Sequence, residues 1–281
     1  MPYKYVFFGT PEFAEIILQR LVRAGMLPLA LVCNPDRPIN RKKTITPPPA
    51  KKYILENSPK IKIFQPEKID NAFLTELKDT KADFYIVAAY SKILPTELLA
   101  IPLLGVIGVH PSLLPKYRGS TPIQSAILTG EEGTGVSLYL MDEKMDAGPV
   151  LARQETRDKG QDYLTLMREL AKLAGDMLIE ILPKFVARET NPLPQDETKA
   201  TYTKKFNNEN AYVSPEDLKN AETNDNEKAL EIWRKIRALN PEPGTWTMKD
   251  GKRLKLLEAK IENGLLKLTK IQKEGGKAIN I

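Results

Sequence analysis

The stretch from residue 105 to residue 148 constrains the fold and the function of this chain more than any other. Two apolar runs in it read as β-strands, 106–109 and 136–141, and each stops in a loop that carries a titratable side chain. The first run ends at His110, and the second leads into an acidic loop that contains Asp146. An open α/β sheet builds its site at the ends of its strands. This pattern therefore predicts a site in which His110 and Asp146 meet.

His110 is the default candidate for proton transfer, because imidazole titrates nearest to neutral pH. A lone histidine that fills an ordinary loop is the alternative. Asp146 argues against that alternative, since a neighbouring carboxylate favours the charged imidazolium. Asp146 could instead cap a turn with Gly148, but its pairing with His110 favours a catalytic role for both side chains.

Apolar runs alternate with helical patterns along the N-terminal part of the chain. The run 5–8 ends at Gly9, and Thr10 and Pro11 then predict the start of a helix that stops at Gly25. This is the opening β-α unit of a Rossmann-like sheet. A single glycine is not a dinucleotide fingerprint, so NAD is not predicted. Further strands are expected at 29–33, 61–64, 84–89 and 150–155, with helices over 71–77 and 162–185.

A proline-rich segment at residues 191–202 predicts a linker. It divides the chain into a domain of residues 1–190 and a smaller domain of residues 203–281. In the smaller domain a helix is expected at 227–239. Three short alternating runs then follow, separated by Asp-Gly and Asn-Gly turn signals, which predict a small β-barrel.

Several motifs carry a family resemblance. The segments HPSLLPKYRG, TPIQ, TGV and MDEKMDAG resemble the folate-dependent formyltransferases. FGTPEFA near the N-terminus, PDRP followed by TPPPAKK, and FQPEKI narrow the resemblance to the methionyl-tRNA formyltransferases. The resemblance is close over about residues 5–205. It implies an α/β fold, with a Rossmann-like formyltransferase domain built on a mostly parallel sheet and a small OB-like β-barrel domain after it.

The resemblance also implies an activity and a set of ligands. The activity is transfer of a formyl group from 10-formyltetrahydrofolate to the amino group of initiator methionyl-tRNA, with the folate as donor substrate and no metal. A single histidine and a single cysteine, Cys33, likewise argue against a zinc site. The positions implied to contact the folate are Ser112, Leu113, Leu114, Pro115, Ala89, Tyr90, Leu94 and Asp142. A tight proline turn, a plain core strand and an exposed loop are the alternatives for these positions.

Gly108 departs from the family pattern. In the family an Asn, a His and an Asp form the catalytic trio; His110 and Asp146 match, whereas glycine stands at the Asn position. The loss of one such oxyanion donor typically costs ~10²–10³ in rate. We expect the fold and the ligands to be retained and the chemistry to be impaired. A substitute donor such as Gln124 and a catalytically dead folate- or RNA-binding homologue are the alternatives. From the sequence alone, Gly108→Asn is expected to raise the rate.

Basic residues point to a polyanionic partner. The proline-rich loop 34–49 holds a basic cluster of Arg37, Arg41, Lys42 and Lys43, and Asp36 is the one acidic residue that could compensate its charge. The resemblance implies that this loop contacts the acceptor stem of the tRNA. Residues 228–281 carry 13 Lys and Arg against 6 Asp and Glu. A mobile loop and a solvated surface are the alternatives. An acceptor as small as a sugar-nucleotide amine, the second enzymatic possibility, would need neither basic region.

Composition places the chain in a broad class. Of its 281 residues 42% are apolar and 28% are charged, as in soluble globular proteins. No apolar run approaches the ~20 residues that cross a bilayer, and the N-terminus does not read as a signal peptide. A lone cysteine fits a reducing compartment. We therefore expect a cytoplasmic monomer without a membrane partner.

Overall fold

The computed structural model describes residues 3–39 and 44–281. The chain divides into two compact units, and each of them is assembled from more than one segment. The first unit comprises residues 1–118, 135–156 and 167–201, and the second comprises residues 119–134, 157–166 and 202–281. The linker expected at residues 191–202 stays a prediction.

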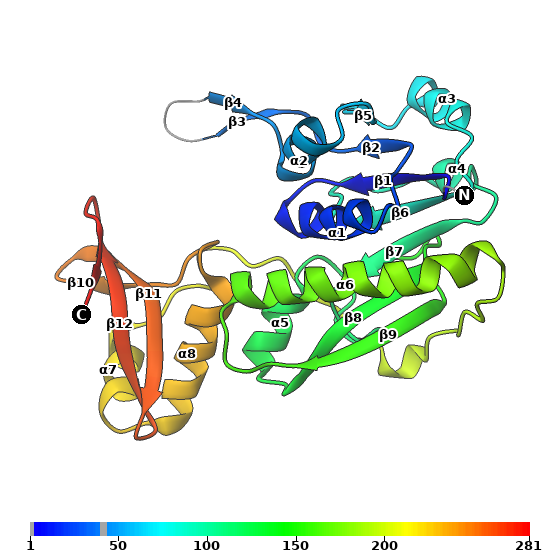
Figure 1. Cartoon of the computed structure of the whole chain (residues 1–281). Coiled ribbons are helices and arrows are strands. Elements are labelled where there is room, and N and C mark those ends of the chain that lie inside the picture. The colour runs from blue at the N-terminus through cyan, green and yellow to red at the C-terminus, as the bar shows by residue number, and fades with distance from the viewer. Residues whose placement is uncertain (1–2, 40–43) are drawn as a thin grey trace. The chain divides into compact units, whose positions relative to one another are not determined.

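The first unit is built on a seven-stranded sheet, in the order β5-β2-β1-β6-β7-β8-β9 (Figure 1). Strands β5, β2, β1, β6 and β7 pair in parallel, whereas β8 pairs with β7 in the antiparallel direction. The mostly parallel sheet expected from the sequence is confirmed. The bounds are β1 Tyr5–Gly9, β2 Ala30–Val32, β5 Lys62–Phe64, β6 Phe84–Ala88, β7 Val106–His110, β8 Gly133–Leu140 and β9 Val150–Arg157.

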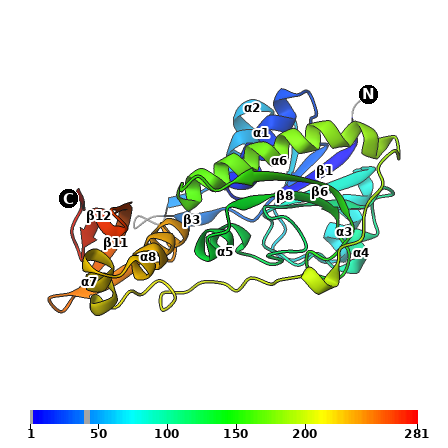
Figure 2. The same cartoon turned by 90° about the horizontal axis from the view of Figure 1, so that it is seen from below.

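Helices cover both faces of this sheet (Figure 2). Helices α1 (Glu12–Arg23) and α6 (Tyr163–Val186) lie side by side on one face, where Phe185 packs edge-on against Phe84. Helices α3 (Asn71–Asp79) and α4 (Thr96–Leu99) lie on the other face. A sheet that is covered on both faces explains why its strands read as continuous apolar runs.

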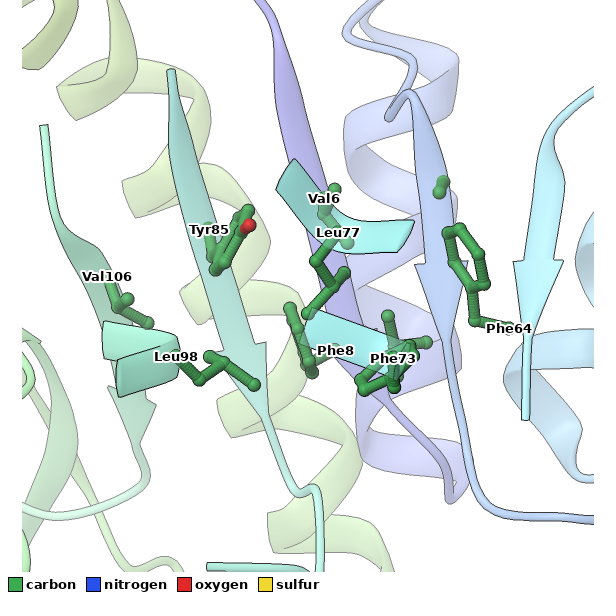
Figure 3. Close-up of a cluster of buried hydrophobic side chains, with 10 residues drawn as sticks. Val6, Phe8, Phe64, Phe73, Leu77, Tyr85, Leu98 and Val106 are labelled. Carbon is green, nitrogen blue, oxygen red and sulfur yellow. The ribbon is translucent and has the colours of Figure 1, made fainter. Parts of the chain in front are cut away.

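The core on the α3–α4 face of the sheet shows which residues of β7, the strand that carries the site, lie on this face. It consists of buried residues from five strands and two helices (Figure 3): Val6, Phe8, Ala30, Val32, Phe64, Phe73, Leu77, Tyr85, Leu98 and Val106. Alternate residues of a strand share one face. Gly108 and His110 therefore follow Val106 on this same face.

Two local expectations are wrong. Thr10 does not cap α1: its hydroxyl accepts a hydrogen bond from the backbone N–H of Asn34, and Pro11 is the N-cap residue. Part of the segment expected to be an irregular loop forms a hairpin of β3 (Arg37–Ile39) and β4 (Thr44–Thr46), and helix α2 (Pro49–Asn57) follows it.

The second unit combines helices with an antiparallel sheet of order β10-β11-β12-β13. Both turn signals are confirmed as hairpin turns with two left-handed residues each: Asp250 and Gly251 have φ of 51° and 71°, and Asn263 and Gly264 have φ of 53° and 80°. The part of the chain for which a small β-barrel was predicted forms a four-stranded antiparallel sheet. The bounds are α5 Pro122–Thr129, α7 Pro215–Thr223, α8 Asn226–Leu239, β10 Trp246–Lys249, β11 Lys252–Glu262, β12 Leu265–Lys273 and β13 Ala278–Asn280.

A buried ion pair lies within the second unit. The guanidinium of Arg237 donates to both carboxylate oxygens of Asp158, at 2.5 Å and 2.7 Å, and the two side chains are 7% and 10% exposed. Arg237 also donates to the backbone carbonyl of Gln161 and lies 4.3 Å from the ring of Trp233. These contacts fix the segment 157–166 to helix α8.

We expect Arg237→Ala to destabilise the protein by about 3–5 kcal/mol, because it leaves the carboxylate of Asp158 buried without its cation. Urea unfolding gives the measurement. The control is Lys267→Ala, since Lys267 and Glu262 form an exposed pair for which the expected loss is under about 1 kcal/mol. Equal losses for the two variants would show that the buried pair does not stabilise the unit.

Candidate functional site

His110 and Asp146 lie together on the α3–α4 face of the sheet. His110 is the last residue of β7, and its Nδ1 lies 3.6 Å from Oδ2 of Asp146. Both side chains are largely buried, with 7% and 15% of their surface exposed. The structure therefore brings together the two titratable groups that the sequence singled out.

The route by which they meet differs from the expectation. Because β8 is antiparallel to β7, the loop after β8 starts beside Val106, at the opposite end of β7 from His110. The loop then folds back over the face of the sheet and carries Asp146 to the histidine. Asp146 has a φ of +53°, a left-handed conformation in which Asp is more tolerated than most residues. The two strands thus do not end at a common edge.

The second nitrogen of His110 determines the tautomer. Its Nε2 lies 2.8 Å from the backbone carbonyl of Tyr117. A carbonyl oxygen only accepts hydrogen bonds, so Nε2 carries a proton. Nδ1 is then the ring nitrogen that faces Asp146. Tyr117 is held with a φ of +59°, in the left-handed region, on the loop that follows β7.

Tyr139, which the sequence analysis did not single out, completes the group. It is 4% exposed, and its hydroxyl donates a hydrogen bond of 2.7 Å to Oδ1 of Asp146. Burial, reinforced by the negative charge of Asp146, raises the pKa of Tyr139 well above its usual range. The hydroxyl therefore stays protonated and acts as a donor. Within an apolar run this tyrosine reads as an ordinary core residue, and no local signal marks it.

Gly108 lies directly opposite Tyr139 in the antiparallel register of β7 and β8. A Cβ atom at position 108 would come within 2.4 Å of the ring of Tyr139, so the ring occupies the space that a side chain there would need. A side chain introduced by Gly108→Asn must therefore displace the ring of Tyr139, and the gain in rate expected from the sequence stays a prediction. Gln124, the substitute donor considered from the sequence, lies in α5 of the second unit.

A buried arginine fixes the loops on either side of this group. Arg118 is 1% exposed, and it donates to Oε1 of Gln195 and forms an ion pair with Glu197 at 2.7 Å. Gln195 in turn donates to the backbone carbonyls of Asp146 and Gly148. The network links the loop after β7, the acidic loop and the chain after α6. The sequence gave no signal for Gln195.

The segment 112–115 forms a tight, internally bonded loop. The hydroxyl of Ser112 donates to the carbonyl of Lys116, and the N–H of Leu114 donates to the hydroxyl of Ser137. Leu114 is buried against Tyr139. Leu113 lies beside Gly135, and the carbonyl of Pro115 accepts from Thr201. These contacts shape the loop, and the role of Ser112, Leu113, Leu114 and Pro115 in binding folate stays a prediction.

The segment after β6 offers unsatisfied polar groups. Ala89 adopts a left-handed φ of +49°, and the chain then turns at Tyr90. The buried Tyr90 hydroxyl and Oδ1 of Asn34 accept or donate no hydrogen bond within the described residues. Buried groups without partners fit a site that a polar heterocycle completes. Leu94 packs on the core beneath, whereas Asp142 is exposed and caps a turn through the N–H of Lys144.

The basic loop is only partly described. Arg37 is exposed and lies 3.3 Å from Glu67. Asp36 does not compensate the loop cations: its carboxylate binds Lys51 and Gln65, and the hydrogen bond from Lys51 is the main cause that lowers the pKa of Asp36. The other members of the basic cluster, Arg41, Lys42 and Lys43, lie outside the described residues.

Residues 3–39 and 44–281 lack two features that mark other classes of protein. No group of three or more His, Cys, Asp or Glu side chains in these residues could hold a metal ion. None of the helices in the same residues is both long enough and apolar enough to cross a membrane.

We expect Arg118→Ala to destabilise the protein by about 1.5–3 kcal/mol, because it removes charge-assisted hydrogen bonds from a buried position. Arg118→Lys is expected to recover little, since an ammonium cannot replace the forked contact with Gln195 and Glu197. Urea unfolding is the measurement. The control is Arg20→Ala, which removes a half-exposed pair with Asp176. A loss no larger than that of the control would contradict the network.

Comparisons with known proteins agree with this architecture. The family model described as formyl transferase matches residues 3–182, and the model described as formyl transferase, C-terminal domain, matches residues 220–265. A methionyl-tRNA formyltransferase of Dictyoglomus thermophilum is 37% identical, over 99% of this chain and 94% of that protein.

Solved structures show the same fold. A methionyl-tRNA formyltransferase from Clostridium thermocellum matches with a TM-score of 0.59 at 18% identity, over 99% of both chains. An N-formyltransferase from Helicobacter canadensis, in complex with folinic acid and dTDP-3-aminofucose, matches with a TM-score of 0.63 at 18% identity, over 94% of this chain and 89% of the other. The sequence matches show the family as well as the fold: this chain belongs to the formyl transferase family.

Proposed function

We propose that this protein transfers the formyl group of 10-formyltetrahydrofolate to the amino group of initiator methionyl-tRNA. The observation that carries the proposal is the contact between His110 Nδ1 and the Asp146 carboxylate at 3.6 Å, inside a chain of the formyl transferase family. The identity of the D. thermophilum relative over nearly the full length of both chains supports the choice of acceptor.

Formyl transfer makes two demands on the side chains of the site. The amine nitrogen attacks the formyl carbon, a new C–N bond forms, the bond from that carbon to N10 of the folate breaks, and the proton lost by the amine balances the one gained by N10. The formyl oxygen carries negative charge at the transition state. A site must therefore stabilise an anion and move a proton.

His110 and Asp146 meet both demands. The carboxylate of Asp146 accepts the amine proton, directly or through a water molecule. An imidazolium at His110, with Nε2–H held by Tyr117 and Nδ1 on the side of Asp146, supplies positive charge beside the reacting atoms. The low exposure of both side chains strengthens these electrostatic effects.

The donor and the acceptor are assigned to different parts of the chain. Oδ1 of Asn34 and the hydroxyl of Tyr90 are buried without hydrogen-bond partners, and this supports binding of the pterin ring at these strand ends. The basic cluster of residues 37–43 and the excess of cations in residues 228–281 support a polyanionic acceptor. Because a tRNA is the proposed acceptor, we propose that the protein acts in the cytoplasm. Because one chain holds all the groups invoked, we propose that it acts as a monomer.

The second candidate acceptor is a sugar-nucleotide amine. The likeness to the H. canadensis structure supports it at the level of the fold. A small acceptor leaves both basic regions without a partner, which is why we rank it below the tRNA.

An acceptor assay tests the proposed function. With 10-formyltetrahydrofolate as donor, we expect formyl transfer to methionyl initiator tRNA and none to dTDP-linked amino sugars. Labelled formyl incorporation into each acceptor gives the measurement. Transfer to the sugar alone would replace the proposal by the second candidate. Tight folate binding without transfer to either acceptor would establish a binding protein.

Neutralising the basic loop separates tRNA binding from folate binding. We expect Arg41→Ala combined with Lys43→Ala to raise the Kd for tRNA by about 10-fold or more at moderate salt, because two phosphate contacts are lost. The Kd for folate should not change. The matched control is Lys78→Ala combined with Lys81→Ala, which removes the same charge at the end of α3. Equal losses of tRNA affinity in the two double variants would contradict a specific loop contact.

A further inference from the structure

The pair formed by Gly108 and Tyr139 is not explained by packing alone. The two residues are direct cross-strand partners, so their side chains would project from the same face. The backbone at Gly108 is not in the left-handed region, so its conformation does not require glycine. What requires glycine is the ring of Tyr139, which lies 2.4 Å from the place of a Cβ atom. A side chain at position 108 and this placement of Tyr139 therefore exclude each other.

The ring and the hydroxyl of Tyr139 have separate contacts. The ring packs in a small cluster with Leu114 and Val150, which a phenylalanine would fill equally well. The hydroxyl extends beyond this cluster to Oδ1 of Asp146, at 2.7 Å. Tyrosine at this position is thus required for its hydrogen bond to the carboxylate, and not for the volume of its ring.

The carboxylate of Asp146 links two side chains. Oδ1 accepts from Tyr139, and Oδ2 faces Nδ1 of His110. Asp146 sits in a loop and has a left-handed φ, so its side chain needs a contact that sets its direction. A donor held by the ordered strand β8 provides that contact. The hydroxyl remains a donor at all working pH values, because burial keeps Tyr139 neutral.

We propose that Tyr139 is a positioning residue that takes the place left by the missing side chain at Gly108 and holds the Asp146 carboxylate against His110. Tyr139 acts through Asp146, and it fills the space above Gly108 from the neighbouring strand. The space that glycine leaves open at position 108 is thereby occupied by its cross-strand partner. This proposal rests on the proposed function.

Tyr139→Phe removes the hydroxyl and keeps the ring. We expect kcat for formyl transfer to methionyl-tRNA to fall ~10–100-fold, as for one hydrogen bond to a charged group. KM for both substrates should stay within about twofold, because the hydroxyl is bonded to Asp146 and acts through it. The pH profile of kcat/KM should change as well, because the hydroxyl donates to the carboxylate that takes part in proton transfer.

The matched control is Tyr5→Phe. Tyr5 is also fully buried in the same sheet, and its hydroxyl donates to the carbonyl of Met26. This variant should lower Tm without moving kcat or the pH profile. An active protein in which Tyr139→Phe keeps the wild-type kcat and pH profile would overturn the positioning role. A wild-type protein that formylates neither acceptor would instead overturn the proposed function, and this proposal with it.

A second pair of variants tests the exclusion between positions 108 and 139. Gly108→Asn alone should lower kcat and Tm, because its Cβ displaces the ring of Tyr139. Combined with Tyr139→Leu, which keeps apolar volume beside Leu114, it should give a higher kcat than either single variant. If Gly108→Asn alone matches or exceeds the wild-type kcat, the two positions do not share one space and the proposal fails.

Discussion

The contact on which the site depends is the one between the Asp146 carboxylate and its two partners. One oxygen accepts from the hydroxyl of Tyr139 on β8, and the other faces the imidazole of His110 at the end of β7. The backbone of the acidic loop is held separately, since Gln195 donates to the carbonyl of Asp146 and is itself bound by Arg118. A carboxylate that has a partner at each oxygen, on a loop whose backbone is also held, is preorganised for proton transfer before any substrate binds.

The antiparallel pairing of β7 and β8 makes this arrangement possible. A parallel strand would send its following loop to the same edge as His110. The antiparallel strand instead places Tyr139 opposite Gly108 and returns the acidic loop across the face of the sheet. The glycine then gives room to the tyrosine, and the tyrosine hydroxyl reaches the aspartate. The effect of a missing side chain at one position of a strand therefore has to be judged together with the side chain of its cross-strand neighbour.

The sequence predicted the mostly parallel sheet and the meeting of His110 with Asp146, because apolar runs and titratable loop residues are local patterns. It missed Tyr139, whose hydroxyl has a partner only because a later loop folds back over it. It also missed Gln195, which contacts Asp146 from 49 residues away. The β3–β4 hairpin was missed because prolines and cations read as loop. Contacts between distant side chains leave no periodic signal in the chain.

The most direct test of the account is a double-mutant cycle on the rate of formyl transfer, with His110→Asn, Asp146→Asn and both together. If the two side chains act as one proton-transfer unit, each single variant lowers kcat strongly and the double variant loses little more, because removing either partner already disables the pair. Rate losses that multiply, as for independent residues, would contradict the central claim that one imidazole and one carboxylate work together at this site.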